Sequence, residues 1–151
     1  MADLDVLLAD LRLLVDVESP SLELEALAKS AAVLASLIEE RTGRAADIVD
    51  GPAGPHVHWS GGGEPKVLIL GHHDTVFPMG TVAQRPFHVV DGRATGPGVF
   101  DMKAGIVQSL HAVAALDDAA GVEMLFTADE EVGSASSREL LEARARACGN
   151  V

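Results

Sequence analysis

The sequence predicts an α/β domain built on a mixed, partly parallel sheet flanked by helices. The main observation is that strand-like and helix-like segments alternate, in the order strand 66–71, helix 102–118, strand 122–127 and helix 135–147. This alternation is typical of parallel strands joined by crossover helices. A hairpin over residues 87–95 interrupts it, with a turn at an Asp-Gly pair. A second observation is the 48% hydrophobic content of the 151 residues, which favours a folded domain with a substantial core.

The first part of the chain predicts two packing helices and then two short strands. Apolar side chains recur at helical spacing over residues 3–17 and 22–42. Ser21 stands where a side chain can cap the start of the second helix. Residues 46–49 and 56–59 show the shorter period of strands on either side of a turn rich in glycine and proline. The two helices offer no chemistry of their own.

Two histidines on the second of those strands are a weak candidate for a metal site. His56 and His58 are two residues apart and therefore share one strand face. No carboxylate lies near them in the sequence. We therefore expect them to be exposed strand residues.

Charge, cysteine content and hydropathy exclude several classes of function. A net charge of −12 disfavours nucleic-acid binding, which depends on lysine and arginine contacts to phosphates. No stretch approaches the roughly eighteen apolar residues of a membrane span. The single cysteine, Cys148, excludes an internal disulfide framework. Because residues 1–5 are acidic and amphipathic, unlike a signal peptide, the sequence predicts a cytoplasmic protein.

Histidines and acidic residues gather in three segments that follow predicted strands or precede a predicted helix. These segments are residues 71–74, 96–103 and 127–133. Open α/β sheets bind ligands beyond the carboxyl ends of their strands, so the first and third segments should meet at one edge. Histidine and carboxylate side chains are common metal ligands. The sequence therefore predicts a metal site at this edge.

The first segment offers a metal ligand and a residue to orient it. His72 and Asp74 point the same way if the chain stays extended, and His73 points the other way. A carboxylate that accepts the second ring N–H of a metal-bound histidine fixes the tautomer of that histidine. The alternative is a polar loop in which Asp74 caps a turn.

The second segment places Asp101 at the start of the predicted helix 102–118. The free N–H groups and the positive end of the helix dipole would stabilise its carboxylate there. A plain helix cap is the competing interpretation.

The third segment contains three consecutive acidic residues that repel one another and would be relieved by a cation. Glu130 and Glu131 diverge in an extended chain, so one can face a cation and the other a substrate. Asp129 is the acidic residue that we expect to remain on the surface. The alternative is a solvated turn before the next helix.

Taken together, these segments resemble the M20 family of zinc metallopeptidases, most closely its glutamate carboxypeptidase branch. The matching stretches are GHHDTVFPMGT (71–81), RATGPGVFDMKAG (93–105) and TADEEVGSASSREL (127–140). They occur in the order and at the separations of that family. The competing enzyme motifs HExxH, GxSxG and GxGxxG are absent from the sequence.

The resemblance implies a role for each of five side chains and two bound zinc ions. His72 would be a ligand of one zinc and Glu131 a ligand of the other, with Asp101 bridging both ions. Asp74 would orient His72, and Glu130 would be the general base. The peptide bond after Asp101 would be cis. Cobalt or manganese could occupy the same site in place of zinc.

The resemblance also implies that the chain is only the N-terminal portion (1–151) of a peptidase catalytic domain. The lid or dimerisation domain, through which a full-length parent can form a homodimer, would be missing, together with one further ligand for each zinc. We therefore expect the isolated chain to bind zinc weakly and to hydrolyse little. A new strand is expected to begin near Val151.

The predicted function is hydrolysis of a peptide or amide bond by a zinc-activated water. A carboxypeptidase that releases a C-terminal glutamate-like residue is the first choice. An N-acyl amino-acid deacylase or a dipeptidase of the same family is the alternative, so the substrate would be a small peptide or an N-acyl amino acid. A rival from another class is a truncated, non-catalytic binding module.

Overall fold

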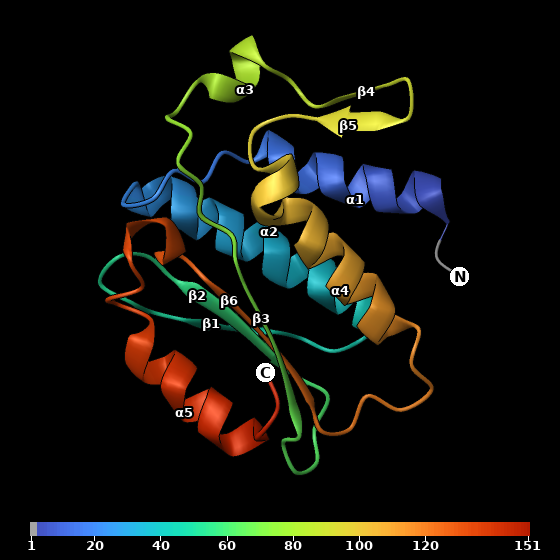
Figure 1. Cartoon of the computed structure of the whole chain (residues 1–151), viewed down its shortest axis with the longest axis vertical. Helices are drawn as coiled ribbons and strands as arrows, with labels where there is room; N and C mark the ends of the chain where they lie inside the picture. The colour runs from blue at the N-terminus through green and yellow to red at the C-terminus, as the bar shows by residue number, and fades with distance from the viewer. Residues whose placement is uncertain (1–2) are drawn as a thin grey trace.

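A four-stranded mixed sheet forms the centre of the fold in the computed structural model, which describes residues 3–151 (Figure 1). The strand order is β1-β2-β6-β3. Their bounds are β1 Asp47–Val49, β2 His56–Ser60, β6 Val122–Thr127 and β3 Val67–His72. β3 and β6 are parallel, whereas β1 with β2 and β2 with β6 are antiparallel. The predicted α/β class with a mixed, partly parallel sheet is confirmed.

Helices cover both faces of this sheet. Figure 1 shows α1, α2 and α4 on one side and α5 on the other. The helices span α1 Leu4–Asp16, α2 Leu24–Thr42, α3 Thr81–Gln84, α4 Ala104–Ala114 and α5 Arg138–Cys148. Successive side chains of β6 reach opposite faces. Met124 and Phe126 join the large cluster under α1, α2 and α4, while Leu125 joins the small cluster under α5.

The parallel pairing of β3 with β6 brings two of the candidate segments to the same edge. Gly71 lies opposite Phe126, and His72 lies opposite Thr127, the last residue of each strand. The Met102 side chain packs directly on Gly71, since a Cβ there would lie 2.9 Å from the end of that side chain. Residues 73–74 and 128–133 therefore leave the sheet side by side, as the sequence predicts.

The hairpin predicted over residues 87–95 is confirmed and lies outside the main sheet. β4 (His88–Val90) pairs with β5 (Arg93–Thr95), and Asp91 and Gly92 form the turn with positive φ angles. Figure 1 shows the hairpin and α3 together beyond α1. The hairpin therefore stands apart from the sheet edge that carries the candidate site.

Two expectations concern the ends of the chain: an acidic, amphipathic start and a strand near Val151. Met1 and Ala2, the first residues of the acidic start, lie outside the described residues. The strand expected near Val151 is represented by one bridge, in which the Leu68 N–H donates to the Asn150 carbonyl over 2.8 Å. Within residues 3–151, no helix has both the length and the apolar character that a membrane span requires.

A buried ion cluster ties α1 to α2 and α4 and should make stability depend on pH. Asp10 is buried and accepts hydrogen bonds from the Arg41 guanidinium (2.6 and 2.8 Å) and from His111 Nε2 (2.6 Å). Burial opposes ionisation of Asp10, but these bonds outweigh it and hold the pKa of the carboxyl below its usual value. A depressed carboxyl pKa stabilises the fold above the unfolded pKa of about 4, and this contribution is lost as pH falls below it.

We therefore expect Asp10→Asn to lower the free energy of unfolding by about 1–3 kcal/mol at pH 7. The difference between the two proteins should shrink as the pH falls below about 4, where the unfolded carboxyl is protonated first and the folded carboxyl, with its lower pKa, afterwards. Urea unfolding across this pH range measures the difference directly. A difference that stays constant between neutral and acidic pH would contradict the expectation.

Candidate metal centre

His72, the last residue of β3, is the meeting point of the candidate residues. Its Nε2 atom lies 3.1 Å from Asp101 Oδ1 and 3.8 Å from Glu130 Oε2. His72, Asp101 and Glu131 each offer one ligand atom, and these three atoms lie within 4.8 Å of one another. The fold thus brings together one residue from each of the three segments that the sequence singles out.

Asp74 is fully buried and contacts both sides of the site. Its Oδ1 lies 3.4 Å from His72 Nδ1, and that nitrogen also donates to the Asp74 carbonyl over 3.0 Å. The carboxylate accepts the backbone N–H groups of Glu130 (3.2 Å) and Glu131 (3.3 Å). The bond from Nδ1 to Asp74 fixes the orientation of the ring. In this orientation the other nitrogen, Nε2, faces Asp101. This geometry suits an orienting carboxylate behind a metal-binding histidine.

The electrostatics of the site favour a bound cation. Burial opposes protonation of His72, but the carboxylates of Asp74 and Asp101 outweigh it and raise its pKa to about 9. Burial also raises the pKa of Glu131; three neighbouring carboxylates add to this effect, and His72 opposes it. The same carboxylates would attract a metal cation, which would replace the proton on the His72 ring. The set of one imidazole and two carboxylates fits zinc, whose usual ligands include both groups.

Asp101 does not open a helix, and this prediction is wrong. It has extended backbone angles (φ −125°, ψ 98°) within the irregular turn Val99–Lys103, and α4 begins only at Ala104. The turn is held by the buried Lys103, whose ammonium donates to the carbonyls of Leu14 (2.9 Å) and Val17 (3.1 Å). The carboxylate of Asp101 is therefore free of a capping role. The peptide bond between Asp101 and Met102 is cis.

The turn after β6 brings both glutamates near His72, while the position of Asp129 differs from expectation. Glu130 and Glu131 open a short 3-10 turn, Glu130–Val132 (η2). The Glu130 side chain is 54% exposed, in line with a group that could reach a substrate. Asp129 is only 1% exposed, so its predicted surface position is wrong. The physical reason is that its carboxylate accepts backbone hydrogen bonds from Ser136 and Ser137.

His73 points away from the site, as its place in the strand predicts. It is buried, and its ring nitrogens lie 3.1 Å from Ser30 Oγ and 3.0 Å from the Pro55 carbonyl. Complete burial lowers its pKa to about 4. His73 is therefore a neutral residue that packs against Ser30 and Pro55, away from the candidate site.

His56 and His58 are not exposed, which corrects the prediction for this pair. His56 is buried and its Nδ1 accepts the Ala128 N–H over 3.1 Å. His58 is partly buried, with Nε2 3.2 Å from Glu123 Oε2. The reason is that helices cover both faces of β2: Val57 and Trp59 pack in the large apolar cluster, while His56 and His58 lie on the opposite face, where Glu123 also binds Arg144 on α5.

Ser21 is a site residue that the sequence did not reveal. Its hydroxyl donates to Asp74 Oδ2 over 2.7 Å, and its backbone N–H donates to the Thr75 carbonyl over 3.1 Å. It does not cap α2, which begins at Leu24 after Glu23. Ser21 and Asp74 are 53 residues apart, so no local spacing could signal the contact.

Ser21→Ala should therefore weaken the support of the site. We expect it to lower the free energy of unfolding by about 1–2 kcal/mol, because a buried carboxylate loses one donor. Urea unfolding measures this loss. Ser109→Ala is the matched control, since the Ser109 hydroxyl only donates to the Ile106 carbonyl within α4. Equal effects of the two substitutions would contradict the role assigned to Ser21.

The fold and the site together define a class of protein. A histidine and several carboxylates converge at the carboxyl end of two parallel strands, where open α/β sheets bind their ligands. Residues 68–150 match the sequence profile of "Peptidase family M20/M25/M40". Because this match covers more than half of the 151 residues, the chain belongs to that family.

Curated relatives support the same assignment. Carboxypeptidase G2 of Pseudomonas sp. (strain RS-16) is 37% identical over 91 residues, which is 57% of this chain and 22% of that protein. Succinyl-diaminopimelate desuccinylase of Anaplasma marginale (strain Florida) is 45% identical over 74 residues, 47% of this chain and 19% of that protein. The matched region thus spans about a fifth of each relative's length.

Solved structures share the fold across nearly the whole chain. An M20 family metallo-carboxypeptidase from Sulfolobus solfataricus superposes with a TM-score of 0.75 at 21% identity, covering 98% of this chain and 36% of its own. Human carnosine dipeptidase 1 gives a TM-score of 0.70, also at 21% identity, covering 95% and 37%. At these identities the likeness shows a common fold.

Proposed function

We propose that this chain forms part of the catalytic site of a two-zinc hydrolase that cleaves peptide or amide bonds. The observation that carries the proposal is the convergence of His72, Asp101 and Glu131, with ligand atoms within 4.8 Å of one another. In the proposed site, His72 would hold one zinc, Glu131 would hold the other, and Asp101 would serve both. Cobalt or manganese can serve the same ligands.

Glu130 and Asp74 have separate roles in the proposed reaction. Bound zinc would polarise the scissile carbonyl and lower the pKa of a water. Glu130 accepts the proton of the attacking water and returns it to the leaving amine. Asp74 keeps the Nδ1 proton of His72 in place, so that the Nε2 atom faces the metal. The exposed Glu130 carboxylate, 3.8 Å from His72 Nε2, supports this division.

The proposed substrate is a small peptide or an N-acyl amino acid. Similarity to carboxypeptidase G2 favours a carboxypeptidase that releases a C-terminal glutamate-like residue. Similarity to a desuccinylase and to dipeptidases keeps an N-acyl amino-acid deacylase or a dipeptidase as the alternative. In this proposal residues 1–151 are the N-terminal portion of a peptidase domain, acting in the cytoplasm, and a longer parent can be a homodimer.

Metal titration of the isolated chain tests the proposed ligands. We expect cobalt or zinc to bind weakly, with a dissociation constant above roughly 1 μM, because each zinc has fewer than the usual three protein ligands here. His72→Ala should remove measurable binding. His88→Ala, on the exposed hairpin, is the histidine control and should leave binding unchanged. Stoichiometric binding of two zinc ions at micromolar or lower concentration would refute the expected weak affinity. Unchanged metal binding by His72→Ala would refute the proposed site.

Activity assays on the complete gene product separate the substrate classes. N-acyl-glutamates, dipeptides and acetyl-amino acids should be offered in parallel, with and without a chelator. Chelator-sensitive cleavage of one class would identify the substrate. If the protein cleaves none of them and its stability ignores the chelator, the binding-module alternative is favoured.

A further inference from the structure

The turn that carries Glu130 and Glu131 is held from two sides by buried carboxylates. Asp74 accepts the backbone N–H groups of both glutamates on the side that faces His72. Asp129 lies immediately before the turn and is as fully buried as Asp74. Residues on this turn supply two of the five proposed site residues, so whatever fixes its path also fixes the site.

Asp129 closes the loop through both its side chain and its backbone. Its Oδ2 atom accepts the N–H groups of Ser136 (2.7 Å) and Ser137 (3.2 Å), just before α5 begins. Its carbonyl accepts the N–H groups of Ser134 (2.8 Å) and Val132 (3.4 Å). One residue therefore binds the chain at four points over the next eight positions.

The loop needs such support because its backbone is strained. Gly133 and Ser134 follow each other with left-handed φ angles of +94° and +55°. A non-glycine residue in this region costs free energy and persists only where its surroundings hold it. Ser134 is held by its N–H bond to the Asp129 carbonyl.

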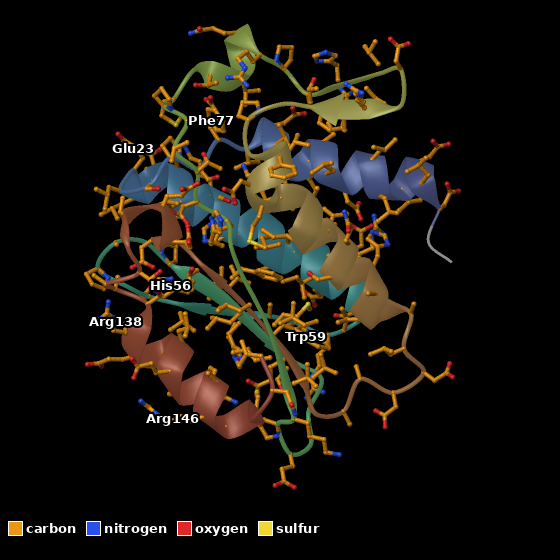
Figure 2. The ribbon with its side chains drawn as sticks, in the orientation of Figure 1. Glu23, His56, Trp59, Phe77, Arg138 and Arg146 are labelled. Atoms are coloured by element: carbon orange, nitrogen blue, oxygen red, sulfur yellow. The ribbon has the colours of Figure 1, made fainter. Side chains whose placement is uncertain are left out.

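His56 anchors the residue before Asp129 on the side away from His72. Its Nδ1 atom accepts the Ala128 N–H, which extends the contact between β2 and β6 past the last paired residues. Figure 2 shows His56 at the end of β2 beside the turn that leads to α5, with Trp59 toward the other end of the strand. The segment Ala128–Asp129 is thus fixed before the chain reaches Glu130.

We propose that Asp129 is a positioning residue of the metal centre. Asp129 fixes the backbone conformation of the turn. This conformation places the Glu131 side chain near His72 and Asp101 and keeps Glu130 beside His72. This inference rests on the proposed function, because it gives Asp129 a purpose only if the site binds metal. Within residues 3–151 the Asp129 side chain hydrogen-bonds Ser136 and Ser137 and none of the three proposed metal ligands, so it acts by holding the loop.

The chain offers variants that separate positioning from charge and from general stability. Asp129→Asn keeps an acceptor for Ser136 and Ser137, and its NH₂ group would take the place of Oδ1, which has no partner among the described residues. Asp129→Ala removes the acceptor, and Asp129→Glu keeps the charge but displaces it. Glu123→Gln is the matched control, since Glu123 is a buried carboxylate of the same strand, β6, that instead binds Arg144 on α5.

The test combines cobalt titration with amide hydrogen exchange on the isolated chain. Asp129→Ala and Asp129→Glu should weaken cobalt binding about 10–100-fold, as loss of an outer support of a metal ligand does. They should also speed exchange of the Glu130 and Glu131 amides at least about tenfold. Asp129→Asn should stay within about threefold of the wild type in both measurements, and Glu123→Gln should lower stability without changing either.

Several outcomes would overturn the inference. It fails if Asp129→Glu, when folded, binds cobalt as the wild type does, or if Glu123→Gln weakens binding equally. If Asp129→Ala does not fold, Asp129→Glu and Asp129→Asn decide the question. If the wild type itself binds no cobalt, the proposed metal site fails, and amide exchange alone then decides whether Asp129 holds the turn.

Discussion

Replacing Glu130 with glutamine should lower kcat of the complete gene product by about 10²- to 10⁴-fold, the usual contribution of a general base. The amide has nearly the same shape as the carboxylate but cannot accept a proton from water. Metal content should not change, because the turn is held by the backbone N–H of residue 130, which donates to Asp74. Steady-state kinetics and elemental analysis of the same preparation measure the two quantities.

Two further variants make this expectation specific to Glu130. Glu131→Gln should lose metal together with activity, because Glu131 is a proposed ligand. Glu139→Gln, at an exposed position in the first turn of α5, should change neither. If Glu130→Gln keeps its kcat, the proton passes through another group, and the role assigned to Glu130 is wrong.

The sequence predicts the convergence of the site because that convergence follows from local signals. The apolar strands 66–71 and 122–127 are separated by helix-forming residues, which indicates parallel pairing. Parallel strands end at one edge, so His72 and the residues after Thr127 must emerge together, as the register of β3 and β6 shows. The hairpin at Asp91 and Gly92 is predicted for a similar reason, since two adjacent residues determine its turn.

The residues that support the site are not predictable in this way, because their contacts are remote in the sequence. His56 meets the Ala128 N–H because β2 pairs with β6, which begins more than sixty residues later. Ser21 reaches Asp74 because the segment before α2 runs beside residues 73–75. In each case the local pattern, a strand or a helix cap, gives no sign of the contact, because the partner is remote in the sequence.

Asp129 shows a related limit. In the sequence it is one of three equivalent acidic residues, and the turn appears solvated. The fold distinguishes them, since Asp129 is turned inward by the N–H groups of Ser136 and Ser137 while Glu130 stays half exposed. Burial of a carboxylate depends on the donors that meet it, and those donors lie seven and eight residues later, just before α5.

Removing Arg144 should cause the largest loss of stability, because it leaves a buried charge without its main partner. Glu123 is 3% exposed in its side chain, and both its oxygens accept hydrogen bonds from the Arg144 guanidinium. Burial opposes ionisation of Glu123, but Arg144 and His58 outweigh it and hold its pKa below the usual value. Arg144→Ala should therefore lower the free energy of unfolding by about 3 kcal/mol, the lower end of the range for a broken buried pair, because Arg144 is 28% exposed.

Removing the unpaired Glu123 carboxylate as well should restore much of the lost free energy of unfolding. Glu123 faces α5 beside an apolar cluster that includes Leu68 and Leu125, so a leucine at position 123 would have apolar neighbours. A buried ion pair replaced by apolar groups is often close to neutral, whereas a half-broken pair is costly. Guanidinium unfolding of Arg144→Ala and of Glu123→Leu with Arg144→Ala should therefore show the double variant as the more stable. If the double variant is the less stable, the ion pair itself, and not the unpaired carboxylate, determines how α5 is held on the sheet.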